Sequence, residues 1–501
     1  MTMTTTYLDL VAEKGTGRVT DEVRREIGDL VSEGGLITEP AQLRTYECDG
    51  LTGFRVVPAL VVLPACTEEV AAVVRVCARE HIPFVARGAG TGLSGGALPA
   101  ADGVVIGLAR MRKIISVDAE NQRAVVQPGV TNLGISAAVA AHDLYFAPDP
   151  SSQVVCTIGG NVAENSGGAH CLKYGFTTNH VLGLTMVCPD GSVVTVGGDS
   201  LDQVGPDLRA LVVGSEGTLG IVTEIIVRLL RKPDAVRTLV ADFADVEHAG
   251  NTVSDIVSHG IIPAAVEMLD ELAIEACEKA TGAGYTVGSP AALVVELDGV
   301  GVEVDAEFEH VQRMCQDNQA THIRIAQDQD ERALIWKGRK AAFAAMGRIS
   351  PDYFVQDGVI PRTKLGATLT RIGQMSREHG LRVANVFHAG DGNLHPLVLY
   401  DNTVEGQAEQ AEELATAIVE LCVEQGGSIT GEHGVGSDKA CSMPKMFTDS
   451  DLTVMALVRA AFDPEGVCNP GKVLPTPRLC GERPGPWRPH PLEQEGVIER
   501  F

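Results

Sequence analysis

Residues 87–97 read RGAGTGLSGGA, and five of these eleven residues are glycine. Gly90, Gly92 and Gly95 match the GxGxxG dinucleotide fingerprint, but that fingerprint opens a helix whose N-terminus receives the pyrophosphate. Here the segment leads instead to an apolar stretch, 104–108, that predicts a strand. A glycine-rich segment between two strands can still bind phosphate, because consecutive backbone N–H groups form an anion-binding nest. We therefore expect a phosphate-binding loop that is not of the NAD type.

The residues before this segment predict a β–α–β unit. Residues 56–65 form an apolar run that ends near Pro64, and a helix follows from Thr67, a suitable N-cap with acidic residues in the next turn. Residues 82–86 predict the following strand, which leads directly into the glycine segment.

Two further clusters of small residues lie downstream. Residues 157–168 read TIGGNVAENSGG, shortly after PDPSS at 148–152, and residues 214–220 read GSEGTLG. Residues 181–196 predict a hairpin with a Pro-Asp-Gly-Ser turn, and residues 221–230 predict another strand. Three glycine-rich segments at strand ends within about 130 residues indicate one extended ligand that carries phosphates.

The character of the chain changes after Lys232-Pro233. Residues 238–300 alternate between strand and helix patterns, which predicts a separate α+β domain from about residue 235. Residues 404–425 predict a long amphipathic helix, and the last twenty-odd residues predict a loosely ordered tail.

Composition excludes several classes of protein. The chain carries 40 basic and 66 acidic residues, a net charge of −26, which argues against binding to phosphate backbones of nucleic acids. Neither a signal peptide nor an apolar run of about 18 residues is found, so no membrane span is expected. The twelve cysteines include no CxxC pair, which excludes the usual iron–sulfur and zinc-ribbon spacings and predicts reduced thiols in a cytoplasmic protein.

Histidines and carboxylates gather in the second half of the chain. Residues 383–400 predict a hairpin in which His388 and His395 occupy paired positions at the turn, so that both rings converge. Glu432 and His433 follow in a glycine-flanked loop. Two imidazoles and a carboxylate form a common divalent-metal set, although a lone strand histidine is more often structural. The spacing is not HExxH, so it does not indicate a zincin protease.

The ordered motifs together carry a family resemblance. RGAGTGLSGGA, PDPSS, TIGGNVAENSGG, GSEGTLGIVTE, HAGDGNLH, GEHGVG and NPGK occur in the order seen in vanillyl-alcohol-oxidase-type flavoproteins. Within these, the chain resembles the D-2-hydroxyacid dehydrogenases, most closely the flavin subunits of glycolate oxidases. The resemblance covers about residues 40–475.

The resemblance implies an α+β fold: a two-subdomain FAD-binding domain of the vanillyl-alcohol-oxidase type plus a ferredoxin-like α+β cap domain. The implied segments are a helical segment at 1–54, the FAD-binding domain at 55–234, the cap at 235–440, a return to the FAD-binding domain at 441–476 and a tail at 477–501. Thr91 stands where family members with covalent flavin carry a histidine, so the implied FAD is noncovalent.

The resemblance also implies which residues bind FAD. These are Arg87, Gly88, Ala89, Gly90, Thr91, Gly92, Leu93, Ser94, Pro148, Asp149, Ser151, Thr157, Gly159, Gly160, Asn161, Glu164, Asn165, Gly167, Gly168, Glu216, Gly220, Ile221 and Asn469.

The same resemblance assigns the chemistry of the second half. It implies His388, His395 and Glu432 as ligands of zinc or another divalent metal and His433 as the catalytic base. Arg339, which on its own pattern would be part of a solvated basic face, is implied to pair with the substrate carboxylate. The implied reaction is oxidation of a D-2-hydroxy acid to the 2-oxo acid by hydride transfer to flavin N5.

Three positions separate this chain from hydroxyglutarate-type members. Phe343, Val355 and Leu397 are apolar where those members carry further polar substrate contacts, which favours small monocarboxylates such as glycolate or D-lactate. Three alternatives stay open: a flavin enzyme for another alcohol, a metal-dependent hydrolase without flavin, and a catalytically silent FAD-binding subunit.

The expected partners follow from the absence of an iron–sulfur spacing. Electrons must leave to an external acceptor, which the resemblance implies to be an iron–sulfur subunit feeding quinone, a soluble carrier or oxygen. Homo-oligomers and complexes are both compatible with the sequence. The expected location is the cytoplasm, with contact to a membrane only through a partner.

Overall fold

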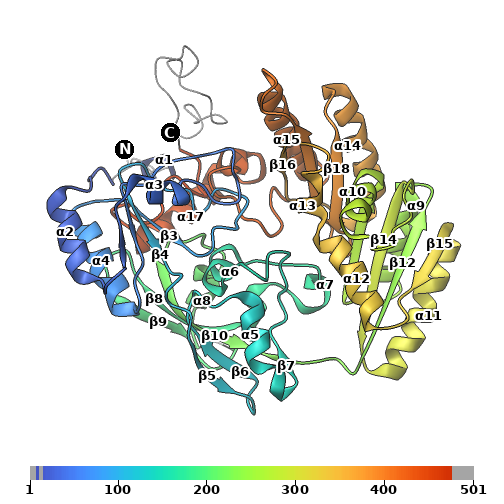
Figure 1. The fold of residues 1–501 in the computed structure, drawn as a ribbon, viewed down its shortest axis with the longest axis horizontal. Helices are drawn as coiled ribbons and strands as arrows, with labels where there is room; N and C mark the ends of the chain where they lie inside the picture. The colour runs from blue at the N-terminus through green and yellow to red at the C-terminus, as the bar shows by residue number, and fades with distance from the viewer. Residues whose placement is uncertain (1–6, 11–14, 203, 477–501) are drawn as a thin grey trace.

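The computed structural model describes residues 7–10, 15–202 and 204–476. Two α+β halves lie side by side in Figure 1, with the blue-to-green N-terminal half on one side and the yellow-to-orange half on the other. The last described helix, α17 (Asp449–Phe462), lies with the N-terminal half. The predicted loose tail at 477–501 lies outside the described residues.

The first glycine segment (87–97) follows the edge strand of a small sheet, as predicted. The strand order is β1 (Leu36–Ile37), β2 (Leu60–Val62), β4 (Val104–Gly107) and β3 (Phe84–Arg87). Both β2 and β3 run parallel to β4, which confirms the β–α–β unit. The connecting helix α4 (Thr67–Arg79) has its N-cap at Cys66, one residue before the predicted cap.

Helix α4 shows why this unit folds. Val70, Val73, Val74 and Cys77 recur at helical spacing, and all four are fully buried in one core with β2, β3 and β4. Each such apolar side chain contributes about 1.5–3 kcal/mol when it leaves water.

A second, antiparallel sheet carries the other two glycine segments. Its strand order is β5 (Ile114–Asp118), β6 (Arg123–Val126), β10 (Ile221–Arg228), β8 (Val181–Val187) and β9 (Val193–Gly197). The hairpin β8–β9 is confirmed, and β10 alternates buried and half-buried residues as a strand over a core does.

The second glycine segment (157–168) is not a loop throughout. Residues Ile158–Glu164 form helix α6, because Ile158 and Val162 are fully buried against the core of the second sheet. The sequence pattern indicates only a glycine-rich cluster, and it does not predict the helix in the first half of the segment. The helix ends at Asn165, whose backbone is left-handed at φ 52°.

The cap is built on an eight-stranded sheet among the described residues. Its order is β15 (Ala320–Ile325), β12 (Ala235–Phe243), β14 (Ala291–Gly299), β13 (Ala265–Asp270), β18 (Val383–His388), β19 (Asn393–Tyr400) and β16 (Asp352–Val355), with β17 (Gly358–Val359) pairing to β19. The antiparallel order β15-β12-β14-β13 is that of a ferredoxin-like unit, as expected. Strands β18, β19 and β16 extend it.

Helices cover both faces of the cap sheet, so its central strands are apolar on both sides. The helices packed on one face are α9 (Val246–Ser258), α11 (Gly301–Asp317), α14 (Leu365–His379) and α15 (Gln407–Glu424). Those on the other face are α10 (Glu271–Thr281), α12 (Gln329–Lys340) and α13 (Ala342–Met346). The second group lies on the side of the sheet that faces the cofactor cavity described below.

The remaining short elements connect these units. They are α1 (Tyr7–Leu10), α2 (Asp21–Leu30), α3 (Pro40–Leu43), α5 (Asn132–Val139), β7 (Leu144–Tyr145), α7 (Cys171–Tyr174), α8 (Leu208–Val212), β11 (Leu230–Arg231) and α16 (Met443–Met446).

The chain after α17 returns to the first glycine segment. Cys468 forms a parallel bridge with Phe84, and the side-chain amide of Asn469 donates to the carbonyl oxygens of Gly96 and Glu216 at 2.9 and 2.7 Å. Lys472 donates to the carbonyl oxygen of Leu98 at 2.9 Å. These bonds hold the first and third glycine segments together.

Two chain-wide expectations can be compared with the structure. No described helix is long and apolar enough to cross a bilayer. Among the described residues, ten cysteines are free thiols, whereas Cys441 is disulfide-bonded, so the expectation of reduced thiols is wrong for Cys441. Spacing along the chain could not show this, because the fold decides which sulfur atoms meet.

Candidate active site

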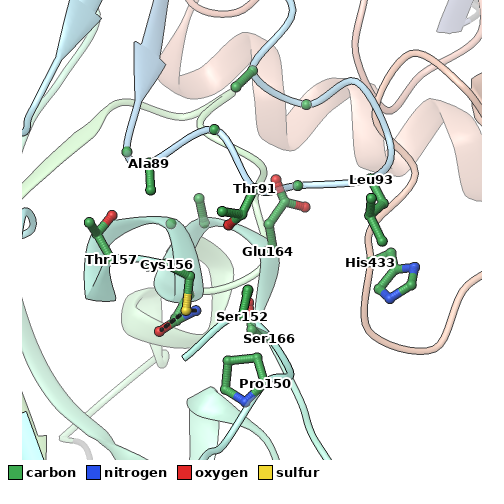
Figure 2. Close-up of a pocket in the computed structure, with 18 of the residues that line it drawn as sticks. Ala89, Thr91, Leu93, Pro150, Ser152, Cys156, Thr157, Glu164, Ser166 and His433 are labelled. Atoms are coloured by element: carbon green, nitrogen blue, oxygen red, sulfur yellow. Dashed lines mark hydrogen bonds between the residues drawn. The ribbon is translucent and has the colours of Figure 1, made fainter. Parts of the chain in front are cut away.

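A cavity of about 380 Å³ opens where the three glycine segments meet the cap (Figure 2). We call it the cofactor cavity; a space of this size suits a small-molecule ligand. Of the residues predicted to bind FAD, its wall contains Arg87, Gly88, Ala89, Gly90, Thr91, Gly92, Leu93, Ser151, Thr157, Gly159, Gly160, Asn161, Glu164, Gly167, Glu216, Gly220 and Ile221.

The other predicted FAD residues do not line the cavity. They are Ser94, Pro148, Asp149, Asn165, Gly168 and Asn469. Their contacts are to the backbone or side chains of neighbouring segments: the Ser94 carbonyl oxygen, for example, accepts from the backbone N–H groups of Ser437 and Asp438, both at 3.0 Å.

Polar atoms without partners mark the wall as a binding surface. The hydroxyl of Thr157 is buried and has no hydrogen-bond partner among the described residues. It stands so close to Gly88 that a Cβ at position 88 would collide with it. Buried polar groups are normally satisfied. A ligand with phosphates and hydroxyls fits this wall, which combines glycine backbone with an unsatisfied hydroxyl.

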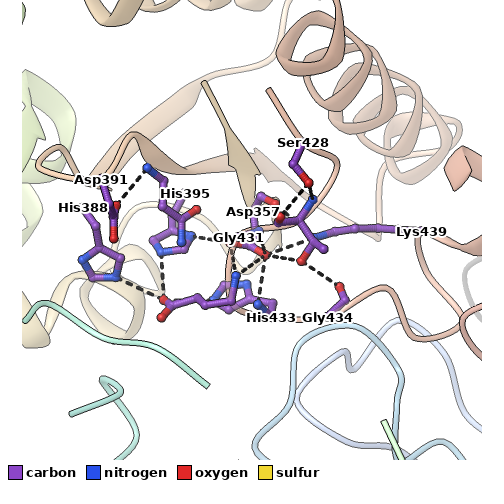
Figure 3. A network of polar contacts seen from close by, with 12 residues as sticks. Asp357, His388, Asp391, His395, Ser428, Gly431, His433, Gly434 and Lys439 are labelled. Carbon is purple, nitrogen blue, oxygen red and sulfur yellow. Dashed lines mark hydrogen bonds and ion pairs between the residues drawn. The ribbon is translucent and has the colours of Figure 1, made fainter. Parts of the chain in front are cut away.

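A histidine–carboxylate cluster lies at the cap end of the same cavity (Figure 3). Glu432 Oε1 is 3.1 Å from His388 Nε2 and 3.2 Å from His395 Nε2. One ligand atom from each of the three residues lies within 4.8 Å of the others, close enough for one metal ion. Glu432 and His433 are on the cavity wall.

The hairpin brings the two histidines together, but not at paired positions as predicted. His388 pairs with Asn393, and His395 pairs with Val386. This offset of two residues keeps both side chains on the same face of the sheet, because the side-chain period of a strand is two. The ring centroids are therefore still only 5.0 Å apart.

His388 is held between two carboxylates. Its Nδ1 is 2.8 Å from Glu267 Oε1, while its Nε2 faces Glu432. Burial opposes a charged ring, but the two carboxylates outweigh it and raise the pKa of His388 well above its usual value. A carboxylate on the outer nitrogen is the usual support of a metal-bound histidine.

His433 has the opposite electrostatic environment. Burial is the main cause that lowers its pKa to about 4, against the opposing effect of Asp357. The ring stacks on His395, with centroids 4.7 Å apart. The Glu432 carboxyl is also buried, but His388 and His395 hold its pKa well below its usual value.

Asp357, which the sequence reasoning missed, organises the loop at 426–436 that carries Glu432 and His433 (the His433 loop). Its carboxylate accepts from the backbone N–H groups of Gly431, Glu432 and His433 at 2.8, 3.1 and 2.9 Å. It also accepts from the hydroxyl of Thr430 at 2.6 Å and from Lys439 Nζ at 3.5 Å. An Asp-Gly pair after a strand predicts only a turn, so no sequence signal marked this role.

Arg339 lies next to the cluster but not on the cavity wall. Its Nη2 is 2.5 Å from Glu267 Oε2, and its side chain is 3% exposed. Its Nε has no hydrogen-bond partner within the described part of the chain. Glu267 was also missed, although a glutamate inside the apolar strand AVEMLD is a detectable signal of a buried polar role.

Lys340 and Phe343 form the cap side of the wall together with Tyr353 and Val355. Lys340 Nζ is 3.3 Å from Asp149 Oδ2, so it is partly neutralised. Of the three positions expected to be apolar near the substrate, Phe343 and Val355 border the cavity, whereas Leu397 is fully buried in the cap core.

Comparisons with family models match two segments of this chain. Residues 58–197 match an FAD binding domain, and residues 232–473 match the C-terminal domain of FAD linked oxidases.

Named relatives cover most of the chain. This chain is 53% identical over 437 residues to glycolate oxidase subunit GlcD of Escherichia coli (strain K12). The aligned residues cover 87% of this chain and 88% of the relative. The chain is 36% identical to the Bacillus subtilis (strain 168) protein of the same name, covering 91% and 97%. A D-lactate dehydrogenase of Archaeoglobus fulgidus is 32% identical, covering 83% and 91%.

Solved structures agree on the fold. The 4-ethylphenol oxidase of Gulosibacter chungangensis superimposes with a TM-score of 0.76 at 18% identity, covering 92% of this chain and 98% of that one. A p-cresol methylhydroxylase superimposes with a TM-score of 0.75 at 18% identity, covering 91% and 97%. The expected vanillyl-alcohol-oxidase-type fold is confirmed.

Proposed function

The chain belongs to the family of FAD-linked oxidases, and on that premise we propose that it oxidises a small D-2-hydroxy acid, glycolate or D-lactate, to the 2-oxo acid. One observation carries the proposal furthest. The glycine segments of the FAD-binding domain and the histidine–carboxylate cluster of the cap border one cavity. Substrate oxidation needs both at one place, a flavin to take a hydride and a base to take a proton.

In this proposal the glycine segments on the cavity wall would hold FAD without a covalent link, and its N5 atom would supply the acceptor for the hydride of the substrate α-carbon. His433 accepts the hydroxyl proton on its imidazole. Its place on the cavity wall supports this role, as does its stacking on His395, which fixes the plane of the ring. Asp357 holds the backbone of His433 and therefore helps to aim the ring.

His388, His395 and Glu432 would hold a divalent metal ion, proposed to be zinc. Both ring nitrogens of His395 are buried and find no hydrogen-bond donor or acceptor of good geometry in the described part of the chain, and Glu267 hydrogen-bonds to the outer nitrogen of His388. A divalent ion there would lower the pKa of the substrate hydroxyl. The donor set of two imidazoles and one carboxylate suits zinc and leaves positions open for substrate.

Arg339 is proposed to bind the substrate carboxylate. A guanidinium fork matches a carboxylate, and the unpaired Nε of Arg339 offers a donor. Apolar Phe343 and Val355 on the wall give a second carboxylate no partner, which supports a small monocarboxylate as substrate.

Electrons leave to an external acceptor in this proposal. The Escherichia coli relative is by name one subunit of glycolate oxidase, which supports a complex with another subunit. We propose that this partner is an iron–sulfur subunit that passes the electrons to quinone. The chain would work in the cytoplasm and reach a membrane only through that partner.

The test is the visible spectrum of the purified protein, recorded without oxygen before and after addition of glycolate, D-lactate or L-lactate. Bleaching of the flavin by glycolate or D-lactate, but not by L-lactate, is the expected result. A flavin spectrum that none of the three changes would overturn the proposed substrates and leave a silent subunit or another alcohol. A colourless protein that cannot be reconstituted with FAD would overturn the proposed reaction.

A further inference from the structure

Two carboxyl groups meet on the wall of the cofactor cavity. Glu164 ends helix α6, and Glu216 lies in the third glycine segment (214–220). A Cβ on Gly434 would stand under 3.0 Å from an oxygen of each, Glu164 Oε2 and Glu216 Oε1. Both oxygens therefore face the same small space, against the residue that follows His433.

Glu164 also contacts the first glycine segment. A Cβ on Gly96 would lie 2.7 Å from Glu164 Oε1. Figure 2 shows the Glu164 carboxyl group on the side of that segment, in the same cavity as His433. One side chain thus touches two of the walls between which the cofactor must fit.

The two carboxyl groups differ in what stabilises a negative charge. Glu216 accepts from the backbone N–H groups of Val435 and Gly436 at 2.7 and 2.6 Å, one on each oxygen. Glu164 Oε2 is inaccessible to solvent and has no hydrogen-bond donor among the residues described. An ionised carboxylate without donors is costly in a buried place, whereas a protonated one needs an acceptor, and Glu216 is such an acceptor.

The surrounding charges favour the same distribution. Glu164 faces two acidic groups, Glu216 and Asp49, and one ammonium group, Lys439, which is itself 3.5 Å from Asp357. Burial, then Glu216 and Asp49, raise the pKa of Glu164 well above its usual value. Burial also raises the pKa of Glu216. The two backbone N–H donors oppose this rise, and so do the positive charges of Lys439 and Lys472.

We propose that Glu164 is a neutral carboxylic acid whose proton is donated to the ionised Glu216, and that this hydrogen bond fastens helix α6 to the His433 loop and so keeps the cofactor cavity closed around FAD. Glu164 is a positioning residue in this scheme and touches no reacting atom. Loss of the proton would place two negative charges side by side in a buried space. The inference rests on FAD binding and on neither the substrate nor the metal.

The consequence to measure is a proton-dependent affinity for FAD. At pH values at which Glu164 of the FAD-free protein has lost its proton, FAD binding requires uptake of a proton. The Kd of the full-length protein for FAD should then rise by up to about tenfold per pH unit. The measurement is a flavin-fluorescence titration of protein freed of its flavin, repeated from about pH 7 to about pH 10.

Glu164→Gln is the informative variant, because an amide keeps a donor and cannot ionise. Its FAD affinity should stay flat towards alkaline pH, whatever level it has at neutral pH, because the amide carries no proton to lose. Glu120→Gln, at an exposed position far from the cavity wall, is the matched control and should follow the wild-type curve. The proposal is overturned if Glu164→Gln and wild type show the same dependence of FAD affinity on pH.

An infrared measurement on the wild-type holoprotein needs no variant. A protonated carboxyl carbonyl band should be present at neutral pH and should disappear over the same pH range in which FAD affinity falls. FAD affinity that falls while the carboxyl bands stay constant would also overturn the proposal. Either readout can fail while glycolate or D-lactate still bleaches the flavin, so the two proposals are tested separately.

Discussion

The imidazole rings of His395 and His433 are stacked, with centroids 4.7 Å apart and planes within 8° of each other. One ring belongs to strand β19 and the other to the His433 loop. Asp357 lies behind both, 3.7 Å from His395 Nδ1 and hydrogen-bonded to the backbone of His433. The proposed metal ligand and the proposed base are thus held by one buried carboxylate as a single unit.

The first prediction concerns the base. Replacing His433 by alanine should slow reduction of the flavin by substrate by about 10²–10⁴-fold, because general base catalysis is worth that much. FAD should stay bound. Rapid mixing without oxygen measures the rate, and His310→Ala, at an exposed position on α11, is the control. Reduction of the variant at the wild-type rate would show that His433 is not the base.

The second prediction concerns the metal. His388→Ala should lose the bound divalent ion and the activity while the protein stays yellow, because the ring is a metal ligand in the proposed site and does not line the cofactor cavity. Elemental analysis of purified wild type and variant gives the metal content. Equal metal content in the two proteins would contradict the site.

The third prediction tests the support of that ligand. Glu267→Gln should weaken metal binding by about 10–100-fold, the usual effect of losing a carboxylate behind a metal-bound histidine. Competition with a chelator measures the affinity. His388→Ala removes the ligand itself and gives the limiting value, so a Glu267→Gln affinity equal to that of wild type would mean that Glu267 serves only its ion pair with Arg339.

Local patterns predicted most of the fold. The β–α–β unit, the β8–β9 hairpin and helix α15 are confirmed, because buried apolar residues recur in them at strand or helix spacing. Helix α6 was missed because Gly159 and Gly160 disguise a segment whose helix depends on tertiary burial of Ile158 and Val162.

The site was harder to predict where distant segments meet. The sequence of the turn does not determine the register of the hairpin. The predicted pairing of His388 with His395 therefore differs from the observed pairing by two residues. Asp357 lies 76 residues before His433, and its backbone partners in the loop are N–H groups that every sequence has. The family resemblance, which rests on the order of the motifs, predicted roles for site residues that local spacing alone could not indicate.

The fourth prediction separates two neighbouring cations. Arg339→Lys should lower kcat/KM at least tenfold with little change in Tm, because a lysine keeps the charge next to Glu267 but loses the fork for a carboxylate. Lys340→Gln should change KM by less than about threefold, since Lys340 is already paired with Asp149. A larger effect of Lys340→Gln would transfer the carboxylate-binding role to Lys340, which, unlike Arg339, borders the cavity.

The fifth prediction concerns the contact between the FAD-binding domain and the cap. His170 Nδ1 is 2.9 Å from Asp149, and its Nε2 is 3.2 Å from Glu296 of strand β14 in the cap. Burial opposes the charged ring, but the two carboxylates outweigh it and raise the pKa of His170 to about 10. A raised histidine pKa stabilises the folded state fully below the unfolded pKa of about 6.5 and no longer does so once pH has risen through about 10.

Wild-type Tm should therefore fall across this range, whereas His170→Gln should start lower and show a smaller fall. Thermal unfolding followed by circular dichroism measures both curves, with His310→Gln as control. Parallel curves for wild type and His170→Gln would mean that the His170 charge does not hold the cap to the FAD-binding domain.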